Sequence, residues 1–384
     1  MRWTTIVSIL ISGSCIAQWT QLTDLPGTAR DDAASFAIDG RIYVGTGREV
    51  GFGYTNDWFA FDEASGTWSA IASLPASGRQ YCTTFSNGVH GYLFGGTNGG
   101  GPLNELWRYD PTQDLWEQRE PLPGPGRYAC ASMLEGHIVG GLLANGITTN
   151  EHWSYDLVLD EWSPRAALPG PGRHRAAAGE GWVMGGADET YTALSDGYVF
   201  DGGDPGVWSP MEDLPNALYG ADATGQVIIG GASSDTVLYH DVWYYLSGWF
   251  TLNAFPGGGR RGGAIASSNG PGGQSWLYYG TGTDLVQRHN DWWRLSFDPA
   301  NINEHDQMLT TVFPNPASNE LRVETGADPL NKRYVIVDAL GRTVRLSTPL
   351  GTGSIDVSQL AMGQYRLLID AGMERTRSNF MIIR

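Results

Sequence analysis

Six segments of the chain repeat one layout, and this repeat limits the possible folds more than any other feature. A Trp opens each segment, and Leu-Pro or Phe-Pro follows it. An Arg, a run of small residues, an apolar stretch ending in glycines and an aromatic stretch complete the layout. Each segment holds four strand-length runs with turn residues between them, which predicts one four-stranded blade of a β-propeller per repeat. The opening tryptophans are Trp19, Trp68, Trp116, Trp162, Trp208 and Trp249.

The motifs inside the repeat are alike in all six copies. The turns that precede the first strand read LPGTAR (25–30), LPASGR (74–79), LPGPGR (122–127), LPGPGR (168–173), LPNALY (214–219) and FPGGGR (255–260). The glycine signatures are RIYVGTG (41–47), GYLFGG (91–96), HIVGG (137–141), WVMGG (182–186), VIIGG (227–231) and LYYGTG (277–282). This set resembles the kelch repeat, and the resemblance covers residues 18–298. It implies an all-β, six-bladed kelch propeller. The fifth copy departs from the pattern, with Tyr219 in place of the Arg.

The two ends of the repeat region indicate how the ring closes. The sixth repeat ends at NDWWRLSFD (290–298) with no Trp strand after it, and an unmatched Trp strand, QWTQL (18–22), stands near the start. We expect 18–22 to complete the sixth blade, because a closed propeller leaves no free sheet edge between its first and last blades.

The first 17 residues have the pattern of a secretory signal peptide. Arg2 precedes a largely apolar run, and Cys15-Ile16-Ala17 offers small residues before a cut at Gln18. Cys15 as a lipoprotein cysteine is the weaker interpretation, because Ser12-Gly13-Ser14 lacks the expected leucine. No other segment is long and apolar enough to span a bilayer. The mature chain then keeps Cys82 and Cys130, which we expect to be buried free thiols; a disulfide would require both to lie near the ring axis.

The last 77 residues differ from the rest in charge and pattern. Residues 18–307 hold 34 acidic and 14 basic residues, whereas 308–384 hold 7 and 9. After a linker (299–307), short alternating runs predict a small β-sandwich of about seven strands. FPNPA (313–317), DALGR (338–342) and GQYRLLI (363–369) together resemble the type A C-terminal sorting domain of the type IX secretion system. The resemblance implies an Ig-like sandwich that the type IX machinery recognises. An ordinary Ig-like accessory domain is the alternative.

Composition excludes several functions. The net charge is −17, which argues against nucleic acid as a partner. The single lysine, Lys332, excludes a P-loop or a Schiff-base lysine anywhere before it.

Most repeated residues have a structural interpretation. We expect the tryptophans to pack between sheets and the diglycines to let inner strands approach closely. The recurring arginines are expected to bridge neighbouring blades through carboxylates or turn carbonyls, and the recurring acidic residues to fix turns. The arginines are Arg30, Arg79, Arg127, Arg173 and Arg260, and the acidic residues are Asp57, Glu105, Glu151, Asp196, Asp241 and Asp291.

Catalytic and metal motifs find little support. GxSxG, HExxH, CxxC and a pair of His at ligand spacing are all absent from the sequence. A copper site like that of the galactose-oxidase group stays a minor alternative, since Tyr81, Cys82, Tyr128, Cys130 and His174 fall on adjacent inner strands. A second inner-face His is missing, so we predict no catalytic residue, metal or cofactor.

A ligand site is expected where equivalent positions of the six repeats differ. Such positions follow each recurring Arg, and their turns emerge on the same face as the loops after the glycine signatures. We call this end of the ring the mouth, and the opposite end, with hairpins such as SNGVHG (86–91), the hairpin face. The predicted mouth residues are Asp31, Asp32, Arg48, Tyr81, Tyr128, His174, Arg175, Tyr219 and Arg261.

Two functions from different classes remain. The favoured one is a non-catalytic binding module for an extracellular protein or glycan, secreted or held at the outer cell surface after passing through the periplasm. The alternative is a carbohydrate-active kelch enzyme, such as a sialic-acid mutarotase or epimerase-like protein. Its only hint is the pair His174-Arg175 near Asp31-Asp32.

Overall fold

The computed structural model describes residues 18–245, 248–269, 275–297, 311–324, 333–338, 343–350, 353–370 and 375–383. The chain divides into two compact units, Met1–Asn301 and Ile302–Arg384. Every regular element in these described ranges is a β-strand, which confirms the all-β prediction. No helix long and apolar enough to cross a membrane occurs in the described part of the chain.

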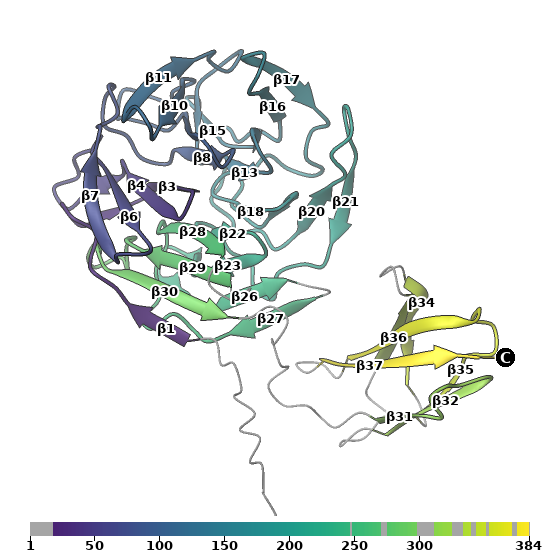
Figure 1. Ribbon diagram of the computed structural model, residues 1–384. Helices are drawn as coiled ribbons and strands as arrows, with labels where there is room; N and C mark the ends of the chain where they lie inside the picture. The colour runs from purple at the N-terminus through teal and green to yellow at the C-terminus, as the bar shows by residue number, and fades with distance from the viewer. Residues whose placement is uncertain are drawn as a thin grey trace, which may run out of the picture. The chain divides into compact units, whose positions relative to one another are not determined.

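Six four-stranded antiparallel sheets stand in a ring (Figure 1), which confirms the six-bladed propeller. The first blade is β3 (Ala34–Ile38), β4 (Arg41–Gly45), β6 (Trp58–Asp62) and β7 (Thr67–Ile71). The second is β8 (Thr83–Ser86), β9 (Gly91–Phe94), β10 (Leu106–Asp110) and β11 (Leu115–Arg119). The third is β13 (Ala131–Met133), β14 (His137–Val139), β16 (His152–Asp156) and β17 (Glu161–Arg165).

The other three blades follow the same order, with the innermost strand first. The fourth is β18 (Ala177–Gly179), β19 (Trp182–Met184), β20 (Gly197–Phe200) and β21 (Trp208–Met211). The fifth is β22 (Asp222–Thr224), β23 (Val227–Ile229), β26 (Val242–Tyr245) and β27 (Trp249–Leu252). The sixth is β28 (Ala264–Asn269), β29 (Ser275–Gly280), β30 (Trp292–Phe297) and, from the start of the chain, β1 (Gln18–Gln21).

The sixth blade joins the two ends of the propeller. Gln18 of β1 pairs with Ser296 of β30, and the antiparallel register continues to Gln21 and Trp293. The backbone ladder of the last blade is therefore completed by the first strand. Three short ribbons lie between blade strands: β2 (Arg30–Asp31) with β5 (Arg48–Glu49), β12 (Arg127–Tyr128) with β15 (Leu142–Leu143), and β24 (Ala232–Ser234) with β25 (Val237–Leu238).

The six repeated tryptophans join neighbouring blades. Each indole N–H donates a hydrogen bond to a backbone carbonyl just after the outer strand of the preceding blade. The bonds measure 2.7–3.2 Å and are Trp19 to Asn253, Trp68 to Thr23, Trp116 to Ala72, Trp162 to Glu120, Trp208 to Ala166 and Trp249 to Glu212. A buried indole needs such a partner, so the repeat places both the ring and the carbonyl.

The propeller core consists of aromatic clusters between adjacent blades. Phe36 and Trp58 of the first blade pack with Tyr109 and Trp116 of the second, and the Trp58 and Trp116 ring centroids are 4.9 Å apart. Each blade thus covers the apolar face of its neighbour, since a single four-stranded sheet cannot bury its own.

The C-terminal unit has two sheets around one apolar core. One contains β31 (Thr311–Phe313), β32 (Glu320–Glu324) and β35 (Ser354–Asp356); the other contains β33 (Arg333–Asp338), β34 (Thr343–Pro349), β36 (Gly363–Asp370) and β37 (Arg375–Ile382). Leu321, Ile336 and Leu367 are fully buried in the core. The structure therefore has seven strands in the described part of this unit, as the sequence predicts.

Candidate functional site

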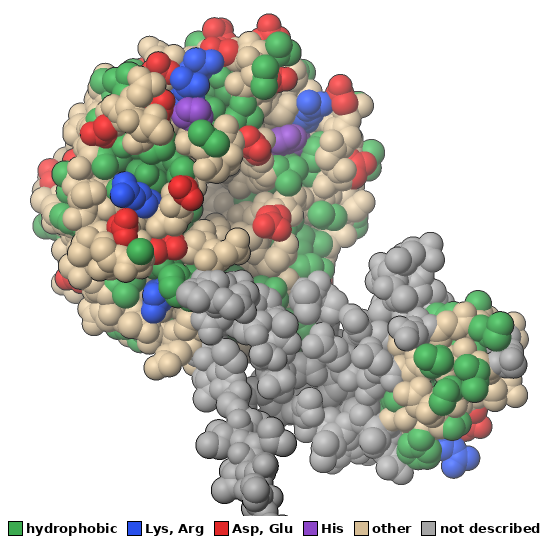
Figure 2. Space-filling model, in the orientation of Figure 1, with side chains coloured by type: hydrophobic (Ala, Val, Ile, Leu, Met, Phe, Trp, Pro, Cys, Tyr) green, Lys and Arg blue, Asp and Glu red, His purple; other side chains and the backbone are tan. Residues whose placement is uncertain are grey.

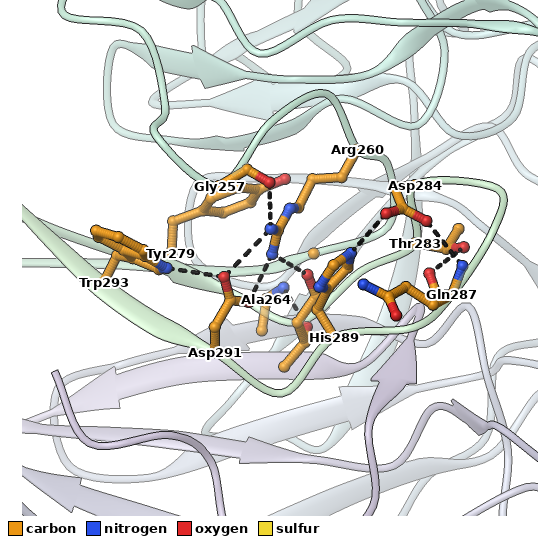
Figure 3. A network of polar contacts seen from close by, with 12 residues as sticks. Gly257, Arg260, Ala264, Tyr279, Thr283, Asp284, Gln287, His289, Asp291 and Trp293 are labelled. Carbon is orange, nitrogen blue, oxygen red and sulfur yellow. Dashed lines mark hydrogen bonds and ion pairs between the residues drawn. The ribbon is translucent and has the colours of Figure 1, made fainter. Parts of the chain in front are cut away.

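The recurring arginines form a buried layer beneath the mouth, which we call the arginine layer. Their side chains are 0–1% exposed, and each pairs with the recurring carboxylate of its own repeat. The N–O distances are 2.5 Å for Arg30–Asp57, 2.8 Å for Arg79–Glu105, 2.7 Å for Arg127–Glu151, 2.9 Å for Arg173–Asp196 and 2.6 Å for Arg260–Asp291. Figure 3 shows the sixth-blade pair, where Arg260 also donates to the Gly257 carbonyl.

The expectation that these side chains bridge neighbouring blades is wrong, because their partners lie within the same repeat. Neighbours are joined by the backbone instead. The carbonyl of the layer residue accepts a hydrogen bond from the second signature glycine of the preceding blade. The six bonds, from 2.7 to 3.3 Å, are Gly47 to Arg79, Gly96 to Arg127, Gly141 to Arg173, Gly186 to Leu218, Gly231 to Arg260 and Gly282 to Arg30.

This bond pattern corrects the register of the fifth repeat. Leu218, and not Tyr219, occupies the place of the arginine there, because Leu218 is the residue that accepts from Gly186. Tyr219 is the next residue, and its bridge to Ala232 matches that of His174 to Ala187 in the fourth blade. The pair of variable positions in the fifth blade is therefore Tyr219-Gly220.

The second residue after each layer position belongs to a closed backbone ring around the axis. We call these six residues the axial hexad. Each backbone N–H donates to the carbonyl of its counterpart in the preceding blade, at 2.7–3.4 Å. The ring runs from Asp32 to Gly262, Gly220, Arg175, Ala129, Tyr81 and back to Asp32. It gives the mouth a continuous backbone floor.

All six hexad residues have left-handed backbone conformations. Their φ angles are 53° for Asp32, 57° for Tyr81, 55° for Ala129, 53° for Arg175, 62° for Gly220 and 64° for Gly262. Glycine adopts this conformation without strain, whereas other residues lose about 1–2 kcal/mol. The first four blades thus hold side chains where the last two have glycine. Strain of this kind is concentrated at functional sites in proteins.

Arg175 lies at the centre of the mouth. Its guanidinium stacks on Tyr81 of the second blade at 4.5 Å and donates a hydrogen bond to the Tyr81 hydroxyl. Tyr219 and Tyr191 lie 5.9 and 6.0 Å from it. One cation is therefore surrounded by tyrosine rings from three blades.

Asp32 is the acidic residue of this centre. Burial and the neighbouring Asp31 carboxylate raise the pKa of Asp32 to about 7, although Arg175, Arg261 and a hydrogen bond from Tyr81 oppose the shift. Burial also raises the pKa of Tyr81, so its hydroxyl stays protonated at neutral pH. Asp32 is thus the group of the mouth centre whose charge changes near neutrality.

A second cluster borders the first at the junction of the first and sixth blades. Asp31 lies opposite Arg48 in the backbone register of the β2–β5 ribbon, and the Asp31 carboxylate accepts a hydrogen bond from Arg288 Nε at 2.5 Å. The guanidiniums of Arg48 and Arg288 lie 4.6 and 5.0 Å from the centroid of the Phe52 ring. Phe52 is 63% exposed.

The remaining predicted residues lie around the centre, with one exception. The Tyr128 ring is 5.7 Å from that of Tyr81, and Arg261 lies 5.6 Å from Tyr219. Tyr219 donates to Asp235 at 2.9 Å. His174 is the exception: it is 1% exposed beneath Tyr191, and burial lowers its pKa to about 4.

A central channel lies below the floor. It is a cavity of about 460 Å³ lined by the innermost strands, and the centre of the propeller is visibly hollowed in Figure 2.

Cys82 and Cys130 are free thiols beside this channel, and burial raises the pKa of both thiols to about 12. A Cβ on Gly96 or Gly141 would meet these sulfur atoms at 2.7 and 2.5 Å. The second signature glycine is therefore required by the residue packed against it.

Metal ligands do not gather in the described ranges, where no group of three His, Cys, Asp or Glu side chains could hold an ion. The structure does bring together a His pair that the sequence spacing did not reveal. His137 Nδ1 and His152 Nε2 are 2.9 Å apart, and burial lowers the pKa of His152 to about 4. This pair lies between β14 and β16, away from the mouth.

Two residues of interest were missed in the sequence. Phe52 lies in the loop after the first glycine signature, at the place that Tyr191 holds in the fourth blade, and both have a left-handed φ. Asp222 stands at an inner-strand position that holds Ala or Thr in the other blades, a difference visible in the alignment of repeats. Its carboxyl accepts hydrogen bonds from Gly263 N at 2.8 Å and Tyr279 Oη at 3.2 Å, and burial raises its pKa well above the usual range.

Comparison with known proteins agrees with this architecture. The family model of the KLHDC2/KLHL20/DRC7 Kelch-repeats domain matches residues 14–178, and that of the secretion system C-terminal sorting domain matches residues 311–384. The solved structure of YjhT is 17% identical with a TM-score of 0.61, over 71% of this chain and 95% of that one. No curated protein matches the chain significantly.

Proposed function

Because this chain is a kelch-repeat β-propeller that ends in a type IX sorting domain, we propose that it is a non-catalytic binding module that holds an extracellular protein or glycan at the mouth. The sorting domain marks the chain for export by type IX secretion, to the cell surface or beyond. The ligand is therefore sought outside the cell.

One observation carries the proposal: Asp32, Tyr81 and Arg175 occupy left-handed positions where glycine would cost less. Their side chains converge over the backbone floor, and Arg175 reaches Tyr81 two blades away. Positions that only maintain the repeat are alike in all blades, whereas these differ. A ligand that contacts several blades at once explains why each blade keeps a different residue there.

Binding is favoured over catalysis by the state of the mouth residues. The mouth histidine is buried, and the raised pKa of Tyr81 keeps its hydroxyl neutral. An acid–base mechanism needs both a proton donor and a proton acceptor in reach of a substrate. Asp32 could serve as one of them, but neither the buried His174 nor Tyr81 supplies the second. Arg175 and the tyrosines instead provide charge, aromatic faces and hydrogen bonds, which are the groups of a recognition surface.

The test uses paired variants and a glycan array beside a sugar-turnover assay. Arg175→Ala with Tyr81→Ala should abolish binding, and Ser86→Ala with His90→Ala on the hairpin face should leave it intact. Loss only in the second pair would place the site on the other face. Turnover of a bound sugar would identify an enzyme in place of a module.

A further inference from the structure

We propose that the mouth binds a polyanionic polysaccharide, a chain of sugar rings with carboxylate or sulfate groups, across the two cation–aromatic clusters. The inference rests on the proposed function and names its ligand class. Such a ligand requires two neighbouring subsites for its anionic groups and exposed aromatic side chains near them.

The outer cluster provides the first subsite. Arg48 and Arg288 stack on Phe52, and a guanidinium held on a ring keeps donors free for an oxyanion. Arg288 donates a hydrogen bond from its Nε to the Asp31 carboxylate. Arg48 Nε is buried without a partner, and within the described ranges no carboxylate pairs with Arg48. A bound anion would complete the coordination of this arginine.

The central cluster provides the second subsite. Arg175 donates to the Tyr81 hydroxyl, a neutral acceptor, and its Nε is buried without a partner. Its stacking on tyrosine rings fixes the guanidinium over the floor. Tyr191, beside it, is 48% exposed.

The two subsites adjoin through consecutive residues. Asp31 contacts Arg288 of the outer cluster, and Asp32 faces Arg175 of the central one. Consecutive Cα atoms are about 3.8 Å apart, so one ligand with repeated charges can contact both clusters. Of the 14 basic residues in 18–307, four lie here: Arg48, Arg175, Arg261 and Arg288. Arg288, Arg175 and Arg261 face Asp31, Asp32 and Asp235, whereas no carboxylate in the described ranges pairs with Arg48. Outside the mouth, acidic residues exceed basic ones, which disfavours binding of a polyanion there.

The aromatic rings favour sugars over acidic peptides. Phe52 and Tyr191 are 63% and 48% exposed at the rim, and the exposed part of an aromatic ring can pack on the C–H groups of a pyranose ring. An acidic peptide would use the arginines but would gain less from direct contact with these rings. The contribution of Phe52 therefore separates the two ligand classes.

The experiment measures dissociation constants by calorimetry with the chain from Gln18 to Arg384. Its probes are polygalacturonate, dextran sulfate, neutral dextran and poly-L-glutamate. At least one of the two charged polysaccharides should bind, and dextran should not. Arg48→Gln and Arg288→Gln should each weaken binding about tenfold, as expected for a lost charge-assisted hydrogen bond. Phe52→Leu loses the arginine stacking with either ligand but the contact to a sugar ring only with a polysaccharide, so it should weaken polysaccharide binding about fivefold more than poly-L-glutamate binding.

The matched control is Arg41→Gln. Arg41 is a half-exposed arginine at the hairpin-face end of β4, and its loss should change nothing. An equal loss in Arg41→Gln would show unspecific charge attraction and overturn the inference. Tighter binding of poly-L-glutamate, no effect of Phe52→Leu, or no binding of either charged polysaccharide would also overturn it. Binding of neutral dextran that is lost in Arg175→Ala with Tyr81→Ala would overturn the inference of an anionic ligand but would leave the proposed function standing. Loss only in Ser86→Ala with His90→Ala would refute the proposed function itself.

Discussion

The arginine layer and the axial hexad lie two residues apart in the same six turns, yet they follow opposite rules. The layer holds Arg in five blades, each buried and paired with a carboxylate of its own repeat. The hexad holds Asp, Tyr, Ala, Arg and two Gly in one strained conformation. A position whose role is structural has one best residue, and it repeats. A position that varies while it bears strain indicates selection for something other than stability.

The largest effect on stability is expected from Arg79→Ala, which tests the structural role of the arginine layer. The change removes the arginine that pairs with Glu105 and donates to the Gly95 carbonyl, in a site where Arg79 is fully buried and Glu105 is 30% exposed. Removing one member of a buried pair costs about 3 kcal/mol in the free energy of unfolding. Urea denaturation measures this free energy of unfolding. The control Arg41→Ala removes an exposed pair and should cost no more than about 0.5 kcal/mol. Similar losses of unfolding free energy in Arg79→Ala and Arg41→Ala would contradict the structural role of the arginine layer.

Asp222 sharpens the comparison, since it varies between blades but lies below the mouth. Its folded-state pKa is raised by burial, so folding favours the protonated form. The unfolded carboxyl ionises above about pH 4. Stability from this group is therefore full below that pH and falls as pH rises towards the folded pKa.

Asp222→Asn removes this titration. As the pH rises above about 4, the variant should become progressively more stable relative to the unmodified chain, with a slope of up to about 1.4 kcal/mol per pH unit. Urea denaturation across this range provides the values. A stability difference that stays constant with pH would contradict the assigned protonation state.

The smallest effect is expected from Ala129→Gly, which tests the strain of the hexad without touching a mouth side chain. Ala129 has a φ of 55°, and glycine relieves a strain of about 1–2 kcal/mol while adding about 0.5–1 kcal/mol of unfolded-state entropy. The melting temperature should rise slightly, by the equivalent of about 0.5 kcal/mol. A clear fall in the melting temperature would show that the hexad conformation is not strained.

Repetition made the fold readable from the sequence. The Trp spacing predicted six blades, and the unmatched Trp19 strand indicated the place that β1 takes beside β30. The fifth repeat was misaligned because its turn is one residue shorter between Pro215 and the layer position. Its register is set by the Gly186–Leu218 hydrogen bond, which no sequence motif shows.

The site was harder to predict from the sequence than the fold was, for a related reason. The residues after each layer arginine could be named, but their contacts depend on side-chain reach across the axis. That Arg175 stacks on Tyr81 of the second blade follows from the ring geometry and from no local pattern. Phe52 belongs to a loop whose sequence differs from blade to blade, so the repeat gave no reason to select it over its neighbours.

The most direct test of the account is to give the fourth blade the residue that the fifth and sixth already have. Arg175→Gly relieves about 1–2 kcal/mol of strain, but it adds about 0.5–1 kcal/mol of unfolded-state entropy and removes the contacts to Tyr81, so the free energy of unfolding should fall by much less than the about 3 kcal/mol expected for Arg79→Ala. The same variant should lose binding at the mouth by tenfold or more. Stability and binding measured on one preparation decide the matter: a stable variant that no longer binds is the predicted result. A variant that loses binding together with as much stability as Arg79→Ala would contradict the distinction between the arginine layer and the axial hexad.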